Sequence, residues 1–295
     1  MTKHLLRVDD LTVAELNAVL DRAAELKAAP RSEVAETLPE HTLTMVFEKP
    51  STRTRVAFET GMTELGGHAI FLGPDDIGLG EREPLRDTAR VLSGYGDVVM
   101  ARLYDHEDME ELAAHATVPL INGLTDDAHP CQTLADLLTI RETFGGFEGV
   151  RAAWIGDGNN VAQSFAVGCA LVGLDLTVAT PEGYGLDDDV LERVAALGGD
   201  VETTTDPEAA AAGADVAYTD VWVSMGESGK DLSAFEGFRL DTGLLAPDTK
   251  VMHCLPANRE REVADDVIES ERSLVWQQAE NRLHAQKGLL AYLLD

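Results

Sequence analysis

The feature that most constrains the fold is an alternation of short β-rich runs with helical patterns along almost the whole chain. Strand-like runs are predicted at residues 43–48, 68–72, 98–103, 119–123, 152–156, 175–180, 200–203, 216–219 and 250–254. Helical spacing of apolar residues is found at residues 12–29, 52–65, 85–93, 105–116, 132–144, 161–172, 188–197, 207–212 and 276–294. Strands that alternate with helices form βαβ units with parallel strands. The sequence therefore predicts an α/β fold, with doubly wound parallel sheets that carry helices on both faces.

The length of the chain predicts two domains. A single hydrophobic core stops growing at roughly 250–300 residues, and this chain has 295. Gly145 and Gly146 end the helical pattern of residues 132–144 and are suited to a hinge. We expect one domain over residues 1–144, a second over 145–295 and a cleft between them, with the helix from about residue 276 packing back on the first domain.

Charge excludes one class of function. The chain has 53 Asp and Glu against 23 Lys and Arg, which gives a net charge of -30 and disfavours nucleic acid as a partner. The acidic residues are spread along the chain, as on a solvated surface. We expect a protein of a halophile, because concentrated salt screens the repulsion between like charges. An unusually acidic enzyme of a mesophile is the alternative.

The sequence shows no targeting or membrane segment. No apolar stretch has the length of about 18 residues that spans a bilayer, and the N-terminal residues do not resemble a signal peptide. The three cysteines, Cys131, Cys169 and Cys254, have no C-x-x-C spacing. We therefore expect a soluble protein of the reducing cytoplasm.

The strongest motif follows the first predicted strand, where Lys49-Pro-Ser-Thr-Arg-Thr-Arg55 leads into a helix. Ser51 is suited to the N-cap, and the free backbone N–H groups and dipole of a helix start attract anions. Arg53 adds a guanidinium that matches phosphate. Side chains two positions apart on a helix point about 200° apart, so Arg55 is expected to have a structural role. The alternative is an ordinary capped helix with solvated arginines.

Two further motifs also stand at predicted strand ends. His129-Pro-Cys-Gln132 opens a helix and offers hydrogen bonds to a carbonyl and an amide. In His253-Cys-Leu-Pro256, the proline is expected to hold Leu255 in an extended conformation and leave its carbonyl free. Cys254 is a nucleophile, a soft contact or a core residue, with core as the default. A dyad of His253 with Cys254 is disfavoured, because adjacent residues on a strand face opposite ways.

Glycines after the strand at residues 152–156 give a weak dinucleotide signal. Gly156 and Gly158 match a G-x-G turn, but Val161 replaces the third glycine and no acid stands at the tip of the next strand. The turn is alternatively expected to present Asn159 or Asn160 to a smaller ligand. A metal site is not predicted, because no two histidines stand four residues apart and none stands at ligand spacing from a cysteine. A triad hydrolase is not predicted, because the sequence has no G-x-S-x-G motif.

A later loop adds a possible amino-acid contact. Asp220 precedes Ser224-Met225-Gly226, and such a glycine-containing loop with an acid suits the ammonium and carboxylate of an amino acid. Taken alone, Asp220 is more often a helix-capping residue.

In combination, S-T-R-T-R at 51–55, H-P-C-Q-x-L-A-D at 129–136 and H-C-L-P at 253–256 resemble the aspartate/ornithine carbamoyltransferase superfamily. The segment from Asp220 to Gly226 is similar to its ornithine carbamoyltransferase branch in particular. The resemblance implies transfer of the carbamoyl group of carbamoyl phosphate to the δ-amine of L-ornithine, with citrulline and phosphate as products. It also implies a homotrimer or a multiple of trimers. We expect no cofactor.

The resemblance implies a role for each matching residue, with a carbamoyl phosphate domain at residues 1–144 and an ornithine domain at residues 145–295. Arg53, Arg102, His129 and Cys254 would be catalytic. Carbamoyl phosphate would bind Ser51, Thr52, Arg53, Thr54, Arg102, His129, Pro130, Cys131, Gln132, Cys254, Leu255 and Arg282. Ornithine would bind Asn160, Asp220, Ser224 and Met225, with Cys254 and Asp220 as candidates for deprotonating its amine.

Two positions depart from the pattern of the superfamily. Gly78 stands where a Gln or His usually reaches the neighbouring subunit, so a shared site is less certain, and Pro84 replaces a serine. The alternatives are a carbamoyltransferase for another amine, such as N-acetylornithine or putrescine, a non-catalytic binding protein and, remotely, an NAD-dependent dehydrogenase.

Overall fold

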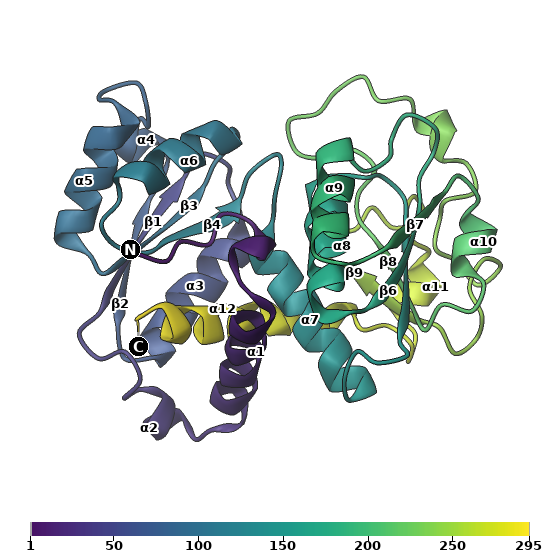
Figure 1. Cartoon of the computed structure of the whole chain (residues 1–295), viewed down its shortest axis with the longest axis horizontal. Coiled ribbons are helices and arrows are strands. Elements are labelled where there is room, and N and C mark those ends of the chain that lie inside the picture. Colours follow the sequence, from purple (N-terminus) through teal and green to yellow (C-terminus); the bar gives the residue numbers. More distant parts are fainter. Residues whose placement is uncertain (1, 295) are drawn as a thin grey trace. The chain divides into compact units, whose positions relative to one another are not determined.

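The computed structural model describes residues 2–294, and these form two compact units. Unit 1 comprises residues 2–138 and 281–294, and unit 2 comprises residues 139–280. The chain passes between them inside helix α7 (Pro130–Phe144) and inside helix α12 (Val275–Leu294) (Figure 1). The division therefore falls within a continuous helix and not at Gly145 and Gly146, where the sequence suggested a hinge.

Unit 1 contains a four-stranded parallel sheet of order β2-β1-β3-β4. Its strands are β1 (Thr42–Phe47), β2 (His68–Leu72), β3 (Val98–Arg102) and β4 (Leu120–Leu124). Its further helices are α1 (Val13–Ala28), α2 (Arg31–Val34), α3 (Thr52–Glu64), α4 (Pro74–Ile77), α5 (Leu85–Tyr95) and α6 (His106–His115), with a 3₁₀ turn at Val8–Asp10. Strands β1 and β3 are buried almost throughout, as in a sheet covered on both faces.

Unit 2 contains a five-stranded parallel sheet of order β7-β6-β5-β8-β9. Its strands are β5 (Arg151–Ile155), β6 (Asp175–Ala179), β7 (Val201–Thr204), β8 (Val216–Thr219) and β9 (Lys250–His253). Its helices are α8 (Asn160–Val172), α9 (Asp188–Ala196), α10 (Pro207–Ala211) and α11 (Asp265–Ile268), with a 3₁₀ turn at Leu232–Phe235. One core cluster of this unit joins Ile155 and Val251 of the sheet to Trp222 and Phe235.

The strand orders determine where a ligand is expected to bind. In unit 1, β1 lies between β2 and β3, and in unit 2, β5 lies between β6 and β8. The connections that follow β1 and β3 run to opposite sides of their sheet, as do those that follow β5 and β8. In open α/β sheets, ligands bind at the carboxyl ends of strands beside such a switch point. The loops after β1 and β3, and the loops after β5 and β8, are therefore the places where functional side chains are expected.

The predicted α/β class and the predicted strands are confirmed, with strand boundaries that differ by at most one residue. Helix α1 begins as predicted with a capping box, in which the Thr12 hydroxyl accepts from Glu15 N and Glu15 accepts from Thr12 N. The four-residue helices α2, α4 and α11 were missed, because so short a helix shows no periodicity. Within residues 2–294, no helix is both long and apolar enough to traverse a membrane.

Candidate active site

The N-terminus of α3 in unit 1 forms the expected anion site. Strand β1 ends at Phe47, and Ser51 caps α3 by accepting a hydrogen bond from Thr54 N at 3.2 Å. The Ser51 hydroxyl also donates to Thr54 Oγ at 3.0 Å, and Thr54 is buried. Thr52 and Arg53 occupy the first two helical positions, where backbone N–H groups have no acceptor within the helix.

Helix α12 brings a second arginine to this helix start. Arg282 donates to the Gln132 carbonyl oxygen at 2.6 Å and to Thr54 Oγ at 3.2 Å. The amide nitrogen of Gln132 in turn donates to Asp136 at 2.7 Å, and all of these side chains are buried. Asp136 thereby fixes the orientation of the Gln132 amide, which leaves its carbonyl oxygen directed at Arg282.

Arg102 and His129 complete the group in unit 1. Arg102 is the last residue of β3, His129 directly precedes α7, and both are buried. Burial holds the pKa of His129 well below its usual value, and the positive charges of Arg282, Arg102 and Arg53 lower it further. His129 is therefore a neutral imidazole beside three guanidinium groups. We call Ser51, Arg53, Thr54, Arg102, His129, Gln132 and Arg282 the arginine group.

Cys131 and Pro130 lie between His129 and Gln132 in the sequence and are not members of the arginine group. The Cys131 thiol donates to the Asn122 carbonyl at 3.3 Å inside the core, so its side chain takes part in packing. Burial raises the pKa of this thiol to about 12, against the opposing charges of Arg282 and Arg102. Pro130 has no N–H and opens α7 as its first residue.

Arg55 has the structural role that helix geometry predicted. Its guanidinium donates to Glu59 at 3.0 Å and lies 3.7 Å from the centre of the Phe71 ring. Sequence reasoning missed Lys49, whose ammonium is buried against Asp126 and lies 4.5 Å from the centre of the Tyr104 ring. Lys49 thus links the turn after β1 with the loops that follow β3 and β4.

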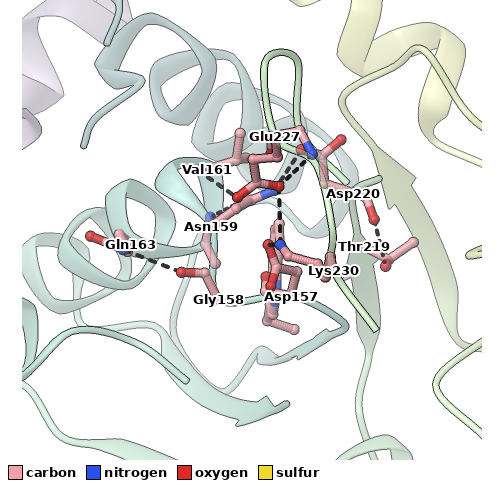
Figure 2. A network of polar contacts seen from close by, with 12 residues as sticks. Asp157, Gly158, Asn159, Val161, Gln163, Thr219, Asp220, Glu227 and Lys230 are labelled. Atoms are coloured by element: carbon pink, nitrogen blue, oxygen red, sulfur yellow. Dashed lines mark hydrogen bonds and ion pairs between the residues drawn. The ribbon is translucent and has the colours of Figure 1, made fainter. Parts of the chain in front are cut away.

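In unit 2, the carboxyl ends of β5, β8 and β9 meet at Asp220. Asn159 caps α8 by accepting from the backbone of Val161 and Ala162, and its side chain donates to Asp220 at 2.9 Å (Figure 2). The Cys254 thiol donates to the other carboxylate oxygen of Asp220, also at 2.9 Å. Two neutral groups from distant segments therefore hold the buried Asp220 carboxylate in place.

A chain of polar contacts continues from this point into the loop after β8. Lys230 donates to Asp157 at 2.8 Å and to Glu227 at 3.1 Å, and Glu227 accepts from the backbone N–H of Ser224 at 2.7 Å. Figure 2 shows Lys230 between these two carboxylates, with Asp220 and Asn159 nearby. Sequence reasoning did not single out Asp157, Glu227 or Lys230. Their pairing joins segments 73 residues apart and has no local sequence signal.

The other predicted ornithine residues lie at the edges of this network. Asn160 is the first residue of α8 and is partly exposed. Met225 is 55% exposed and stands in the loop that Ser224 opens. The side chain of the preceding residue, Asn159, donates to Asp220.

The expectation for Leu255 was wrong. Its φ of 60° is left-handed and not extended, and the Leu255–Pro256 peptide bond is cis. The backbone N–H of Leu255 donates to His253 Nδ1 at 2.9 Å, which turns the chain sharply at this position. His253 Nε2 lies 3.2 Å from the buried carboxylate of Glu262, so His253 and Cys254 have separate partners, as the sequence predicted.

Asp220, His253 and Cys254 nevertheless form a group that their spacing did not reveal. The side-chain atoms of these three residues that are able to coordinate a metal ion all lie within 4.8 Å of one another. Each of the three already takes part in a hydrogen bond with a protein group. Hydrogen bonds within unit 2 therefore explain why these three side chains lie close together.

The glycines of the dinucleotide-like turn serve the packing of unit 2. A Cβ on Gly158 would lie 2.4 Å from the carbonyl oxygen of Gly185, and Gly158 N donates to the carbonyl of Tyr184 at 2.8 Å. In a dinucleotide fingerprint, the second glycine allows the pyrophosphate to approach. Here the protein backbone occupies that approach, which disfavours the dehydrogenase alternative.

Comparison with known proteins gives a match over nearly the whole chain. Residues 3–142 match the family model "Aspartate/ornithine carbamoyltransferase, carbamoyl-P binding domain". Residues 148–293 match the model "Aspartate/ornithine carbamoyltransferase, Asp/Orn binding domain". The ornithine carbamoyltransferase of Haloquadratum walsbyi is 62% identical over 298 residues, which cover 100% of this chain and 98% of that protein.

Solved structures show the same similarity. The ornithine carbamoyltransferase from Pyrococcus furiosus is 48% identical, with a TM-score of 0.93 over 98% of this chain and 96% of that one. The enzyme from Thermus thermophilus is 44% identical, with a TM-score of 0.90 over the full length of both chains.

Proposed function

The chain belongs to the aspartate/ornithine carbamoyltransferase family, and from this premise we propose that it transfers the carbamoyl group of carbamoyl phosphate to the δ-amine of L-ornithine. The products are L-citrulline and phosphate. The observation that carries the proposal is the arginine group, where three guanidiniums surround a capped helix start and a neutral histidine. A chain with a net charge of -30 that gathers these charges at one place provides a site for a phosphate ester.

The roles in unit 1 follow from the charge that develops during the reaction. Attack of the amine on the carbonyl carbon turns the carbonyl oxygen into an oxyanion, which donors fixed in advance stabilise. We assign Arg102, Thr54 and His129 to that oxygen. The phosphate is proposed to bind Ser51, Thr52, Arg53 and the backbone at the start of α3. Arg282 and Gln132 orient the carbamoyl group.

Because burial and the arginines keep His129 neutral, it donates through one ring nitrogen without adding a fourth positive charge. The leaving phosphate remains neutralised at the helix start. No covalent intermediate is needed, because the amine attacks the carbonyl directly.

The roles in unit 2 concern the amine substrate. Asp220 has its carboxylate oriented by Asn159 and Cys254 and is suited to an ammonium group of ornithine. Asn160, Ser224 and Met225 complete the proposed ornithine contacts, and Cys254 with the Leu255 carbonyl contributes to carbamoyl transfer. The δ-amine must lose a proton before it attacks, and Asp220 and Cys254 are the groups we propose for that step.

We also make proposals for three properties of the whole protein: its location, its oligomeric state and its adaptation to salt. We propose a cytoplasmic homotrimer, or a multiple of trimers, adapted to concentrated salt. The salt adaptation is supported by the charge of -30 and by the 62% identity to the enzyme of the halophile Haloquadratum walsbyi. Gly78 has a φ of 54° at the end of α4 and has no side chain with which to reach a neighbouring subunit.

A citrulline assay tests the proposed function. Carbamoyl phosphate is supplied with L-ornithine, N-acetylornithine, putrescine or aspartate in parallel, at several salt concentrations. We expect product only with ornithine and an optimum at high salt. Product with another amine and none with ornithine would refute the substrate assignment, and an optimum in dilute buffer would refute the salt adaptation.

A further inference from the structure

The loop that contains Ser224 and Met225 is tied to the rest of unit 2 by charged side chains. Residues 220–231, between β8 and the 3₁₀ turn at Leu232–Phe235, form no helix or strand. A backbone hydrogen bond of 3.1 Å from Glu227 N to Ser224 O closes a single turn within the loop. The position of the loop therefore depends on side-chain contacts.

Lys230 provides the contact that reaches furthest from the loop. Its ammonium lies 2.8 Å from the Asp157 carboxylate in the turn after β5, and 5.6 Å from the centre of the Tyr184 ring. Tyr184 contributes the backbone carbonyl that accepts from Gly158 N, so Lys230 rests on the packed part of this turn. Figure 2 shows the Lys230 side chain extending from the loop to Asp157.

Burial makes this ion pair different from those on the surface. The side chains of Lys230 and Asp157 are 11% and 8% exposed, and a buried pair is screened much less than an exposed one. Removal of one member leaves the other charge without compensation in a place that water barely reaches. Loss of one partner of this pair is therefore expected to disturb the loop more than loss of one partner of an exposed pair would.

The pair also fixes the position of Ser224 through Glu227. Lys230 contacts Glu227 at 3.1 Å, and the same Glu227 oxygen accepts from Ser224 N at 2.7 Å. Asp157, Glu227 and Asp220 place three carboxylates in one region, and Lys230 contacts two of them. Asp220 instead receives hydrogen bonds from the neutral Asn159 and Cys254.

We propose that Lys230 is a positioning residue for the amine substrate. Lys230 anchors the 220–231 loop to Asp157 and orders Ser224 through Glu227. By neutralising Asp157 and Glu227, it leaves Asp220 as the carboxylate that meets the substrate ammonium. This inference rests on the proposed function, because that function assigns Asp220, Ser224 and Met225 to ornithine. Lys230 itself acts through these residues and not on the reacting atoms.

The test compares Lys230→Met, Lys230→Arg, Asp157→Asn and the double variant Asp157→Asn/Lys230→Met. A displacement of about 1 Å in a site costs about 100-fold in activity, so we expect Lys230→Met to lower kcat/KM for ornithine by about 10- to 100-fold. The KM for carbamoyl phosphate should change by less than about twofold, because the arginine group belongs to unit 1. Lys230→Arg keeps the charge and should restore most of the loss.

The double variant measures coupling between the partners. If the pair acts as one anchor, the double variant should lose no more ornithine kcat/KM than Lys230→Met alone. Arg151→Met is the matched control, since it breaks a pair with Asp215 in the same unit whose side chains are 59% and 39% exposed. It should leave both KM values unchanged.

The outcomes separate this inference from the proposed function. Citrulline formation by the wild type with an unchanged kcat/KM for ornithine in Lys230→Met would overturn the anchoring role alone. An equal rise of both KM values, without recovery in Lys230→Arg, would show a general structural role and overturn it as well. Absence of citrulline from the wild type would refute the proposed function together with this inference.

Discussion

Replacement of Arg282 by Met should weaken the binding of carbamoyl phosphate while leaving the unliganded fold largely intact. The Arg282 guanidinium donates at 2.6 Å to Gln132 and at 3.2 Å to Thr54, and its charge lowers the pKa of His129, as do the charges of the other two arginines. Loss of two hydrogen bonds from this charged donor costs about 1.5–3 kcal/mol each. Relief of repulsion among the guanidiniums opposes that cost, so the unfolding free energy without ligand should fall by less than the sum of about 3–6 kcal/mol.

The liganded protein should respond more strongly. A hydrogen bond between a charged pair contributes about 1.5–3 kcal/mol, which raises Kd by about 10- to 150-fold when it is lost. A ligand at 100 times its Kd stabilises the wild type by about 2.7 kcal/mol, and the same concentration would stabilise the variant by about 1.4 kcal/mol after a tenfold loss and about 0.4 kcal/mol after a hundredfold loss.

The assay is denaturant unfolding of both proteins with and without a phosphonate mimic of carbamoyl phosphate, at fixed high salt. Arg55→Met is the matched control, because it also removes one positive charge. Arg55 lies on α3 and pairs with Glu59 on the surface. A second measurement follows the His129 ring by NMR, and its pKa should rise toward the usual value once Arg282 no longer lowers it. Affinity retained within about twofold in Arg282→Met, or lost equally in Arg55→Met, would refute the reasoning.

Three further predictions follow from the same contacts. Arg53→Ala should abolish nearly all turnover with unchanged circular dichroism, and a variant with more than about a tenth of wild-type kcat would contradict the anion-site assignment. Cys131→Ala should retain activity and lose about 1–2 kcal/mol of unfolding free energy, because the thiol packs in the core against the Asn122 carbonyl; loss of carbamoyl phosphate binding in a folded variant would count against this. Burial raises the pKa of Asp157 to about 6 despite the opposing effect of Lys230, and the negative charges of Glu227 and Asp220 raise it further, so the folded state binds this proton more tightly than the unfolded state. The resulting cost to stability is absent below about pH 4 and grows as pH rises through 6, to about 3 kcal/mol. Unfolding at constant high salt should therefore show the wild type losing stability relative to Asp157→Asn over that range, and a difference that is constant with pH would disprove it.

The sequence determined the features that depend on near neighbours. Periodicity predicted the strands and the longer helices, and the T-x-x-E pattern at Thr12 predicted a capping box. The cap at Ser51 was equally readable, because a hydroxyl and the backbone N–H that it accepts from stand three residues apart. Opposite directions for Arg53 and Arg55 followed from helix geometry alone. Each of these features is set by the conformation of one short segment.

Local rules failed where a contact from elsewhere overrode them. Proline after Leu255 favours an extended conformation, but a hydrogen bond from Leu255 N to His253 accompanies a left-handed one. Cys131 belongs to a motif that points to a ligand, yet its thiol turns to the carbonyl of Asn122 in the core. Gly158 matched a cofactor signature, although residues 184–185 fill the space that a phosphate would need.

Only the tertiary structure decided which side chains meet. Arg282 contacts Thr54 across 228 residues of chain, and Lys230 contacts Asp157 across 73. Helix α12 brings Arg282 to the start of α3, and the strand order of unit 2 brings the loops after β5 and β8 together. A strand reveals its own residues through their spacing, whereas the neighbour it pairs with depends on the packing of the whole unit. The amino-acid sequence therefore shows that an anion-binding helix start with Arg53 exists, and the fold adds Arg102 and Arg282 to it.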